Sequence, residues 1–333
     1  MPEQPNVNIV TQSFPEATAG TAGAATHQFA DFGLADGAHV NSFQNVAQGR
    51  LYVANSSTGK RWSELKPVGD AGYNGLAYPL SSLFGGATIT TATGGVASKQ
   101  WKWTPVIVGA ALGQTYTIER GATGGQARKY TYVCFDNLKL SYTKDDITID
   151  GHAWGREMTT GITLTALTAG AVIGSVPLRG SDTIVYLDAT SGGLGGTQLT
   201  RVGAMDIVWS NYSNPWYGID NTLTSFSMLV PDKPSVDVTF RVQNDAAGIA
   251  IYNNYVVTGN TAYLRFNTVG PVADGTAHYT LTIDMACKIT APQDFTADGP
   301  IEIIPYTAKV AEDTAWGSGQ SMVITLINFI SAL

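Results

Sequence analysis

The stretch YTLTIDMACKIT, residues 279–290, alternates apolar and polar side chains almost without interruption. The apolar set is Tyr279, Leu281, Ile283, Met285, Cys287 and Ile289. Successive side chains of a β-strand lie on opposite faces of the sheet, so this pattern predicts a strand with one buried face and one face toward water. The predicted strand is longer than most strands of globular proteins.

Similar strand patterns fill most of the chain after residue 98. They lie at residues 99–108, 114–121, 129–143, 146–157, 183–190, 197–210, 235–245, 262–269, 301–310 and 321–330. Gly, Asp and Asn gather between them, as in SGGLGG (191–196), where turns are expected. The sequence therefore predicts an all-β protein with one or two short helices, built as a β-sandwich or barrel.

The clearest helix signal is YNGLAYPLSSLFGG, residues 73–86. Its apolar residues Leu76, Leu80, Leu83 and Phe84 recur at helical spacing. Asn74 can cap the start and the glycines at 85–86 can end the helix. Pro79 is tolerated only in the first turn, which predicts a start between residues 76 and 78.

The N-terminal segment, residues 1–45, has little periodicity and is rich in Ala, Gly and Thr. We expect an extended arm or irregular cover there, not a core element. Residues 49–65 follow with the pattern of a strand, a turn at SSTG (56–59) and a second strand.

The two halves of the chain present their elements in a similar order. Each half has a long alternating strand with a lysine between two apolar residues, Lys139 and Lys288, then an acidic turn and a second alternating strand. This favours a tandem duplication, with an N-terminal arm at 1–45, a first β domain at 46–170 and a second at 171–333. The alternative is that any two β-hairpins look alike.

The composition sets limits on function. Charged residues make up 14% of the chain, the formal net charge is −7, and there are 15 Tyr and 7 Trp. Low charge with many Tyr and Trp is typical of surfaces covered by other copies of a protein, although a plain Thr- and Gly-rich β protein looks similar. The absence of a basic run argues against tight DNA binding. The N-terminus has no secretion signal pattern and no stretch is apolar enough to anchor the chain in a membrane, so Cys134 and Cys287 are expected as buried free thiols.

No catalytic or cofactor motif is apparent, so we expect no enzyme activity and no cofactor. HQFADFGLADGAH (27–39) is a weak metal candidate, and a polar loop is the better interpretation. In WSNYSNPWYG (209–218), aromatic side chains could form a platform for stacking sugars. We favour instead a strand end and a proline turn whose aromatics pack against the protein.

The order of the elements resembles the major tail tube proteins of long-tailed bacteriophages, in the form found among phages of actinobacteria. The resemblance covers roughly residues 50–330. It is carried by the segments WSELKPVGDAGYNGLAYPLSSLFGG (62–86), KQWKWTPV (99–106), QTYTIERG (114–121), YTYVCFDNLKLSYTKDDITIDGHAWGR (130–156), YLDATSGGLGGTQLTRVGAMDIVWS (186–210), AHYTLTIDMACKIT (277–290), IEIIPYTAKV (301–310) and MVITLIN (322–328).

The resemblance implies a structural virion protein. Members of this family form rings whose inner strands join into one barrel, and the stacked rings make the conduit for DNA delivery. Two tube domains per chain would make a ring of three copies with pseudo-sixfold symmetry; six copies are the alternative. The expected partners are further copies of the chain, a tape measure protein, and tail terminator and tip proteins, while DNA passes without specific binding. We expect the protein in the phage tail after synthesis in the host cytoplasm.

The strands 130–143 and 279–290 are the candidates for the inner sheet of such a tube. Their polar rows would then face the lumen, which makes Asp136, Lys139, Asp284 and Lys288 the candidate lumen-lining residues. Two other functions fit the sequence: another virion β protein, such as a capsid decoration or baseplate component, and a carbohydrate-binding β-sandwich.

Overall fold

The computed structural model describes residues 9–45, 55–105, 113–122, 125–168, 171–219, 222–290, 292, 294–317 and 319–333. The strands of the first half are β1 (Ile9–Pro15), β2 (His27–Gln28), β3 (Phe32–Asn45), β4 (Asn55–Asp70), β5 (Thr88–Thr91), β6 (Lys99–Trp103), β7 (Tyr116–Ala122), β8 (Ala127–Tyr142), β9 (Ile147–Gly155) and β10 (Thr159–Ile162). Those of the second half are β11 (Thr183–Asp188), β12 (Val202–Ser210), β13 (Ser213–Trp216), β14 (Met228–Pro231), β15 (Ser235–Gln243), β16 (Ala262–Asp274), β17 (Ala277–Ile289), β18 (Thr296–Asp298), β19 (Ile301–Val310) and β20 (Met322–Asn328).

Helices are few and short. They are α1 (Ala77–Phe84), α2 (Ala246–Ile251), the π-helix η4 (Tyr252–Val257), and the 3-10 turns η2 (Gly180–Asp182) and η3 (Ser191–Gly193). The protein is all-β, as its sequence predicts. No helix in the described part of the chain is long and apolar enough to cross a membrane.

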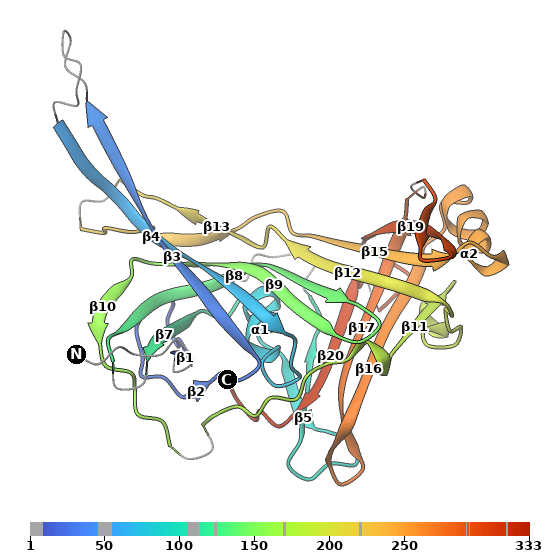
Figure 1. Cartoon of the computed structure of the whole chain (residues 1–333), viewed down its shortest axis with the longest axis horizontal. Coiled ribbons are helices and arrows are strands. Elements are labelled where there is room, and N and C mark those ends of the chain that lie inside the picture. The colour runs from blue at the N-terminus through green and yellow to red at the C-terminus, as the bar shows by residue number, and fades with distance from the viewer. Residues whose placement is uncertain are drawn as a thin grey trace.

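Two antiparallel layers enclose the main core. The first layer has the strand order β3-β4-β9-β8-β12-β15-β19. The second has the order β11-β16-β17-β20-β6-β5. Figure 1 shows β12 and β15 running across β16, β17 and β20, and one cluster of buried apolar residues draws on both layers. A short pairing of β17 with β19 at residues 287–289 joins the layers at one corner.

Strand β8 belongs to two sheets. Its second half pairs with β9 and β12 in the first layer. Its first half pairs with β7 and β10, and β7 pairs in turn with β1 to form a smaller sheet. The long β8 therefore ties the N-terminal strands to the main sandwich.

Strand β17 confirms the prediction made from residues 279–290. All six residues of its apolar row are buried, and Thr280, Thr282, Asp284 and Lys288 lie on the other face with partial or full exposure. Ala286 is the exception on that face, because it is fully buried. The alternation thus reports a strand with its core on one side and solvent on the other.

The N-terminal segment differs from the expectation of an irregular cover. Strand β1 pairs with β7 along its whole length, and Phe29, Phe32 and Leu34 are buried in the main core. Small residues such as Gly and Ala weaken the periodicity of this segment, while backbone pairing with β7 and β4 gives it regular structure.

A buried carboxylate fixes the turn after β1. Glu16 is 4% exposed and accepts four hydrogen bonds. Its Oε2 accepts from the Gly20 amide (2.7 Å) and the Thr115 hydroxyl (2.9 Å). Its Oε1 accepts from the Thr117 hydroxyl (2.9 Å) and the Tyr132 amide (3.0 Å). Because Tyr132 has a positive φ of 54°, the bond also holds β8 in an unfavourable backbone conformation.

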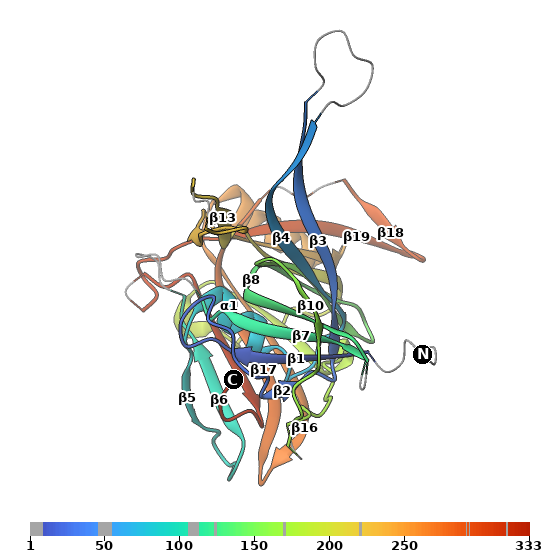
Figure 2. The ribbon, with the colours of Figure 1, turned by 90° about the vertical axis from the view of Figure 1, so that its left-hand side faces the viewer.

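Strands β3 and β4 form a long hairpin that projects from the body (Figure 1, Figure 2). The predicted turn at 56–59 is wrong, because these residues lie within the single strand β4. The polar SSTG stretch pairs with β3 through its backbone, and such pairing needs no apolar alternation. The strand predicted from residue 49 lies in part outside the described residues.

Helix α1 confirms the predicted helix and its end at Gly85, which has a positive φ of 79°. The predicted cap is wrong. Leu76 occupies the N-cap position, and the Asn74 amide instead donates to the Gly174 carbonyl at 2.8 Å. Asn74 therefore anchors a distant loop.

The two halves of the chain are connected by strand pairing. β8 pairs with β12, and β6 pairs with β20. β7–β8 and β16–β17 are matching hairpins, but β9 pairs extensively with β8 whereas β19 meets β17 only at three positions. The tandem duplication and the division at residue 170 stay predictions.

Candidate functional site

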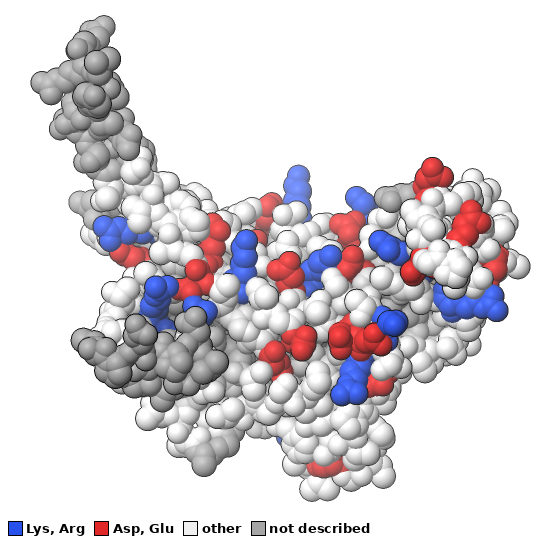
Figure 3. Space-filling view, viewed as in Figure 1, with Lys and Arg blue, Asp and Glu red and all other residues white. Residues whose placement is uncertain are grey.

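The outer face of the first layer carries a row of mixed charge. Asp150, Lys139, Val208, Asp237 and Lys309 lie in register across β9, β8, β12, β15 and β19. Figure 3 shows acidic and basic side chains interspersed over a surface that is mostly uncharged. Such a face holds no large field of one sign that would retain a charged polymer.

Two of the predicted lumen residues lie on this outer face. The Lys139 ammonium is 3.1 Å from the Asp206 carboxylate of β12. Asp136 lies three residues earlier in the same strand, where its carboxylate meets the His152 ring at 2.5 Å. Both side chains are partly exposed, so they remain candidates for a surface that faces a lumen.

The other two predicted residues lie on β17 of the second layer. Asp284 accepts two hydrogen bonds from Arg265 of β16, at 2.6 and 2.9 Å. Lys288 is exposed near the corner between the layers and donates to the Gly259 carbonyl at 2.7 Å. None of the four predicted residues contacts another through a hydrogen bond or ion pair between described side chains.

Reversing the charge of Asp284 is expected to destabilise the fold. In an Asp284→Lys variant the new ammonium faces the Arg265 guanidinium, which lowers the free energy of unfolding by about 2 kcal/mol through the lost charged hydrogen bonds. The swapped pair Arg265→Asp/Asp284→Lys is expected to regain most of this loss, as measured by denaturant unfolding. Thr280→Lys adds a charge to the same strand face as a control. If the losses in free energy of unfolding of the two single variants simply add in the double variant, the result contradicts a coupling between Arg265 and Asp284.

The root of the projecting hairpin is packed under a separate arm. Strands β13 and β14 form a two-stranded sheet of their own, and Phe226 and Leu229 of this arm build a small core with Tyr132 and Cys134. The arm reaches β4 through a hydrogen bond from the Arg61 amide to the Thr224 carbonyl at 2.8 Å. Beyond this contact, the one strand ladder of β4 among the described strands is that with β3.

Strand β3 presents an open edge. Among the described strands its only ladder is the one with β4, so the backbone groups of its other edge have no strand partner. An open strand edge of this length can pair with a strand of another chain.

The opposite end of the molecule carries exposed apolar tips. Figures 1 and 2 place the β16–β17 turn and the β5–β6 hairpin at the end away from the β3–β4 tip. Val96 is 85% exposed and Val272 is 52% exposed there. Asp274 ties the two hairpins together, since its carboxylate accepts from the Ala97 and Val96 amides and the Ser98 hydroxyl. These hydrogen bonds, that of Ala97 first, lower the pKa of Asp274 to about 2.

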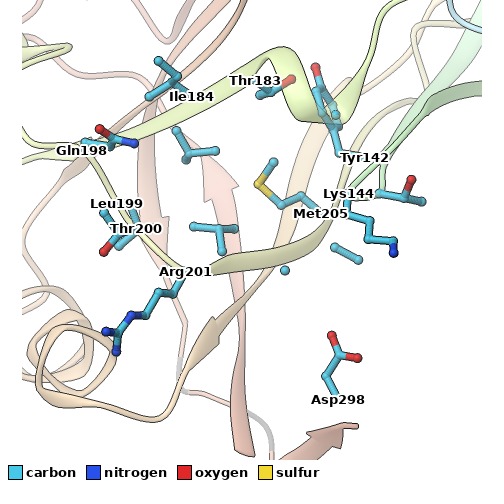
Figure 4. A pocket seen from close by; sticks show the side chains of 16 residues that line it. Tyr142, Lys144, Thr183, Ile184, Gln198, Leu199, Thr200, Arg201, Met205 and Asp298 are labelled. Carbon is cyan, nitrogen blue, oxygen red and sulfur yellow. The ribbon is translucent and has the colours of Figure 1, made fainter. Parts of the chain in front are cut away.

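A pocket of about 490 Å³ opens between the ends of β8, β11 and β12 (Figure 4). Its two basic side chains have acidic partners nearby: Arg201 is 3.0 Å from Asp245, and Lys144 is 3.7 Å from Asp145. Leu199 and Met205 form apolar walls of this pocket, and backbone forms its rim. The pocket is therefore a groove between strand ends.

No known family model matches the chain, and no curated protein matches it either.

The aromatic stretch 209–218 does not form one platform. Trp209 is fully buried in the main core, and Tyr212 packs edge-on against Phe84 of α1. Trp216 is 53% exposed, while Tyr217 packs against Trp62 at the hairpin root. The side chains thus divide between core, arm and surface.

The weak metal candidate at 27–39 is also divided. Asp31 accepts from the Gly75 amide, Asp36 pairs with Arg120 and Arg128, and His39 lies against Glu64. Within the described residues no group of three or more His, Cys, Asp or Glu is arranged to hold a metal ion. These residues lie in β3 and the segment before it, so the interpretation as a polar loop is wrong.

Both cysteines are free and buried, as expected. Burial raises the pKa of the Cys134 thiol to about 11, and burial likewise raises that of Cys287 far above its ordinary value. Thiols held in this way are unreactive at neutral pH.

Proposed function

We propose that this protein is a self-assembling subunit of a bacteriophage tail tube, located in the virion. The resemblance in the order of its elements suggests this function, and the projecting β3–β4 hairpin is the structural observation that supports it best. An isolated two-stranded ribbon is marginally stable in water. A ribbon of this length therefore suits a contact with another chain.

The positions of the hairpin and of the apolar tips favour contact along an axis. The β3–β4 hairpin leaves one end of the molecule, and the β5–β6 and β16–β17 hairpins lie at the other (Figure 2). These two hairpins carry the exposed Val96 and Val272. A contact between two different surfaces that does not close produces an open stack, which is the geometry of a tube.

The open edge of β3 favours a second contact, within a ring. Pairing there would extend the first layer from one copy to the next. We therefore assign the mixed-charge face with Asp136 and Lys139 to the lumen, and place Asp284 on the other layer. A ring of three copies is the preferred arrangement and six copies the alternative, with the tape measure, terminator and tip proteins as further partners.

Electron microscopy of the concentrated, purified protein tests the proposal. Hollow rings or tubes are expected, and end-on views would distinguish three copies from six by their symmetry. Discrete closed particles would contradict a tube and favour a capsid decoration or baseplate protein. A glycan-binding measurement with Trp216→Ala as control addresses the carbohydrate-binding alternative, because Trp216 is the most exposed aromatic residue of that segment.

A further inference from the structure

Strand β4 is incompletely joined to β9 at one place. The ladder between them has pairs from residue 63 to 65 and again at 69–70, but is interrupted at residues 66–68, opposite 150–152 of β9. Pro67 lies in the gap and has no N–H to donate, and Gly69 has a φ of +142° that L-residues rarely adopt. A hollow of about 360 Å³ opens at this place. The gap divides β4 into an inner end at residues 69–70 and an outer part, which pairs with β9 at residues 63–65 before it continues into the hairpin.

Strand β9 also has a defect on its other side. The ladder with β8 shifts by one residue between Phe135 and Asn137, so Asp136 is the extra residue of a β-bulge. Bulged residues leave ladder groups unpaired and bend the strand. The two defects flank the same residue of β9, His152.

His152 spans both defects with its ring. Its Nδ1 lies 2.5 Å from Oδ1 of Asp136 on β8, and its Nε2 lies 3.7 Å from Oε2 of Glu64 on β4. The side chains thus connect β8, β9 and β4 where the backbone ladders are broken.

The connection continues into the hairpin. The same Oε2 atom of Glu64 is 3.4 Å from Nε2 of His39 on β3, and Oε1 of Glu64 accepts from the Trp62 indole at 3.1 Å. The rings of His39 and Trp62 are stacked, with centroids 5.3 Å apart. Glu64 therefore links both strands of the hairpin to His152.

Only the protonated ring can attract both carboxylates. A neutral imidazole has one N–H, whereas the imidazolium has two and a positive charge. Burial alone would lower the pKa of His152, but the hydrogen bond and charge of Asp136, together with the charge of Glu64, outweigh it and raise the pKa above the usual value.

Other titratable and charged groups lie around the ring or further along the same network. Lys66 on β4, Lys139 on β8 and Asp150 on β9 line the hollow beside His152. Tyr217 of the arm has its pKa raised to about 12, first by burial and then by the charge of Glu64, so it stays neutral. His39 on β3 is the second histidine of the network.

We propose that protonation of His152 clamps the projecting hairpin to the body, and that its deprotonation frees a hinge at residues 66–69. Because the folded pKa is raised, the stabilisation is fully present below the unfolded value of about 6.5 and is lost as the pH rises through the higher folded value. The hairpin is then held firmly in mildly acidic solution and moves more freely in mildly alkaline solution. This property belongs to the single chain and does not depend on the proposed tube.

Hydrogen exchange of the purified chain, kept dilute enough to sediment as a monomer, tests the clamp. After correction for intrinsic exchange, amides of residues 61–65 are expected to be about tenfold better protected at pH 5.5 than at pH 8. His152→Gln, which cannot be protonated, is expected to lose the difference. His278→Gln removes an exposed histidine at the other end and is expected to retain it.

If His152→Gln by itself disturbs the hairpin, a second variant still tests the proposal. His152→Arg carries its charge at both pH values and is expected to stay protected at pH 8. Equal protection of the wild-type chain at both pH values would overturn the proposal. So would a pH difference that persists in His152→Gln, or an arginine variant that loses protection at pH 8.

Discussion

Replacing Glu16 with alanine is expected to lower the free energy of unfolding by about 4 kcal/mol, because four buried donors lose their acceptor at once. Two of these donors are backbone amides, of Gly20 and Tyr132, and two are the hydroxyls of Thr115 and Thr117. A single water molecule in the vacated space accepts only two hydrogen bonds and carries no charge, so it does not replace the carboxylate. The shift in the midpoint of chemical denaturation measures the effect.

Two further variants separate charge from shape. Glu16→Gln keeps the volume but replaces one acceptor oxygen with a donor NH₂, so a loss of about 2 kcal/mol is expected from the donors that face it. Glu312→Ala removes an exposed carboxylate and is expected to change stability by less than about 0.5 kcal/mol. A Glu16→Ala variant as stable as the wild type would show that the turn reorganises freely.

Under the proposed function, shortening the β3–β4 hairpin is expected to abolish tube formation while leaving the chain folded. Ser42 and Thr58 are cross-strand partners, so an Asn-Gly turn can join them in place of residues 43–57. The shortened hairpin keeps the arm contact at Arg61 and the pairing with β9. Electron microscopy would report the loss of tubes, and unfolding measurements would report an unchanged midpoint.

A matched control lies at the far end of the molecule. Val257→Ser changes an exposed apolar residue of η4, outside the hairpin and the apolar tips, and is expected to leave assembly intact. Tubes of normal length from the shortened chain would contradict a role of the hairpin in stacking.

The sequence predicts elements whose signal lies within one segment. The alternation of 279–290 and the spacing of Leu76, Leu80 and Leu83 depend on each segment's own side chains, and both predictions are confirmed. Which strands pair depends on segments far apart in the sequence. The pairing of β6 with β20 therefore could not be predicted from the residues of either strand. The N-terminal strands were missed for the same reason, since β7 and β4 provide the order that their own residues do not show.

The candidate site was only partly accessible to sequence reasoning. Lys139 and Asp136 were predicted from the polar residues of a strong strand pattern, and their place in a lumen stays a prediction. Asp136 reaches the face of Lys139 through the bulge between Phe135 and Asn137. His152 was missed because its importance comes from a bulge and a ladder gap, neither of which changes the strand pattern strongly. A histidine beside Gly151 within a strand was the available signal, since glycine in a strand often marks irregular pairing.

The place of β20 has a consequence for how the chain folds. This strand is the last in the chain, yet it lies between β6 and β17, and the Trp101 indole on β6 donates to the Ile330 carbonyl at 2.9 Å. Closing a loop of more than 200 residues is entropically slow, and until it closes both neighbouring strands expose unpaired edges. Completion of the second layer must therefore await synthesis of residues 322–328. In the cell, nascent chains would pass through an aggregation-prone stage in which a chaperone that shields strand edges raises the yield of folded subunits.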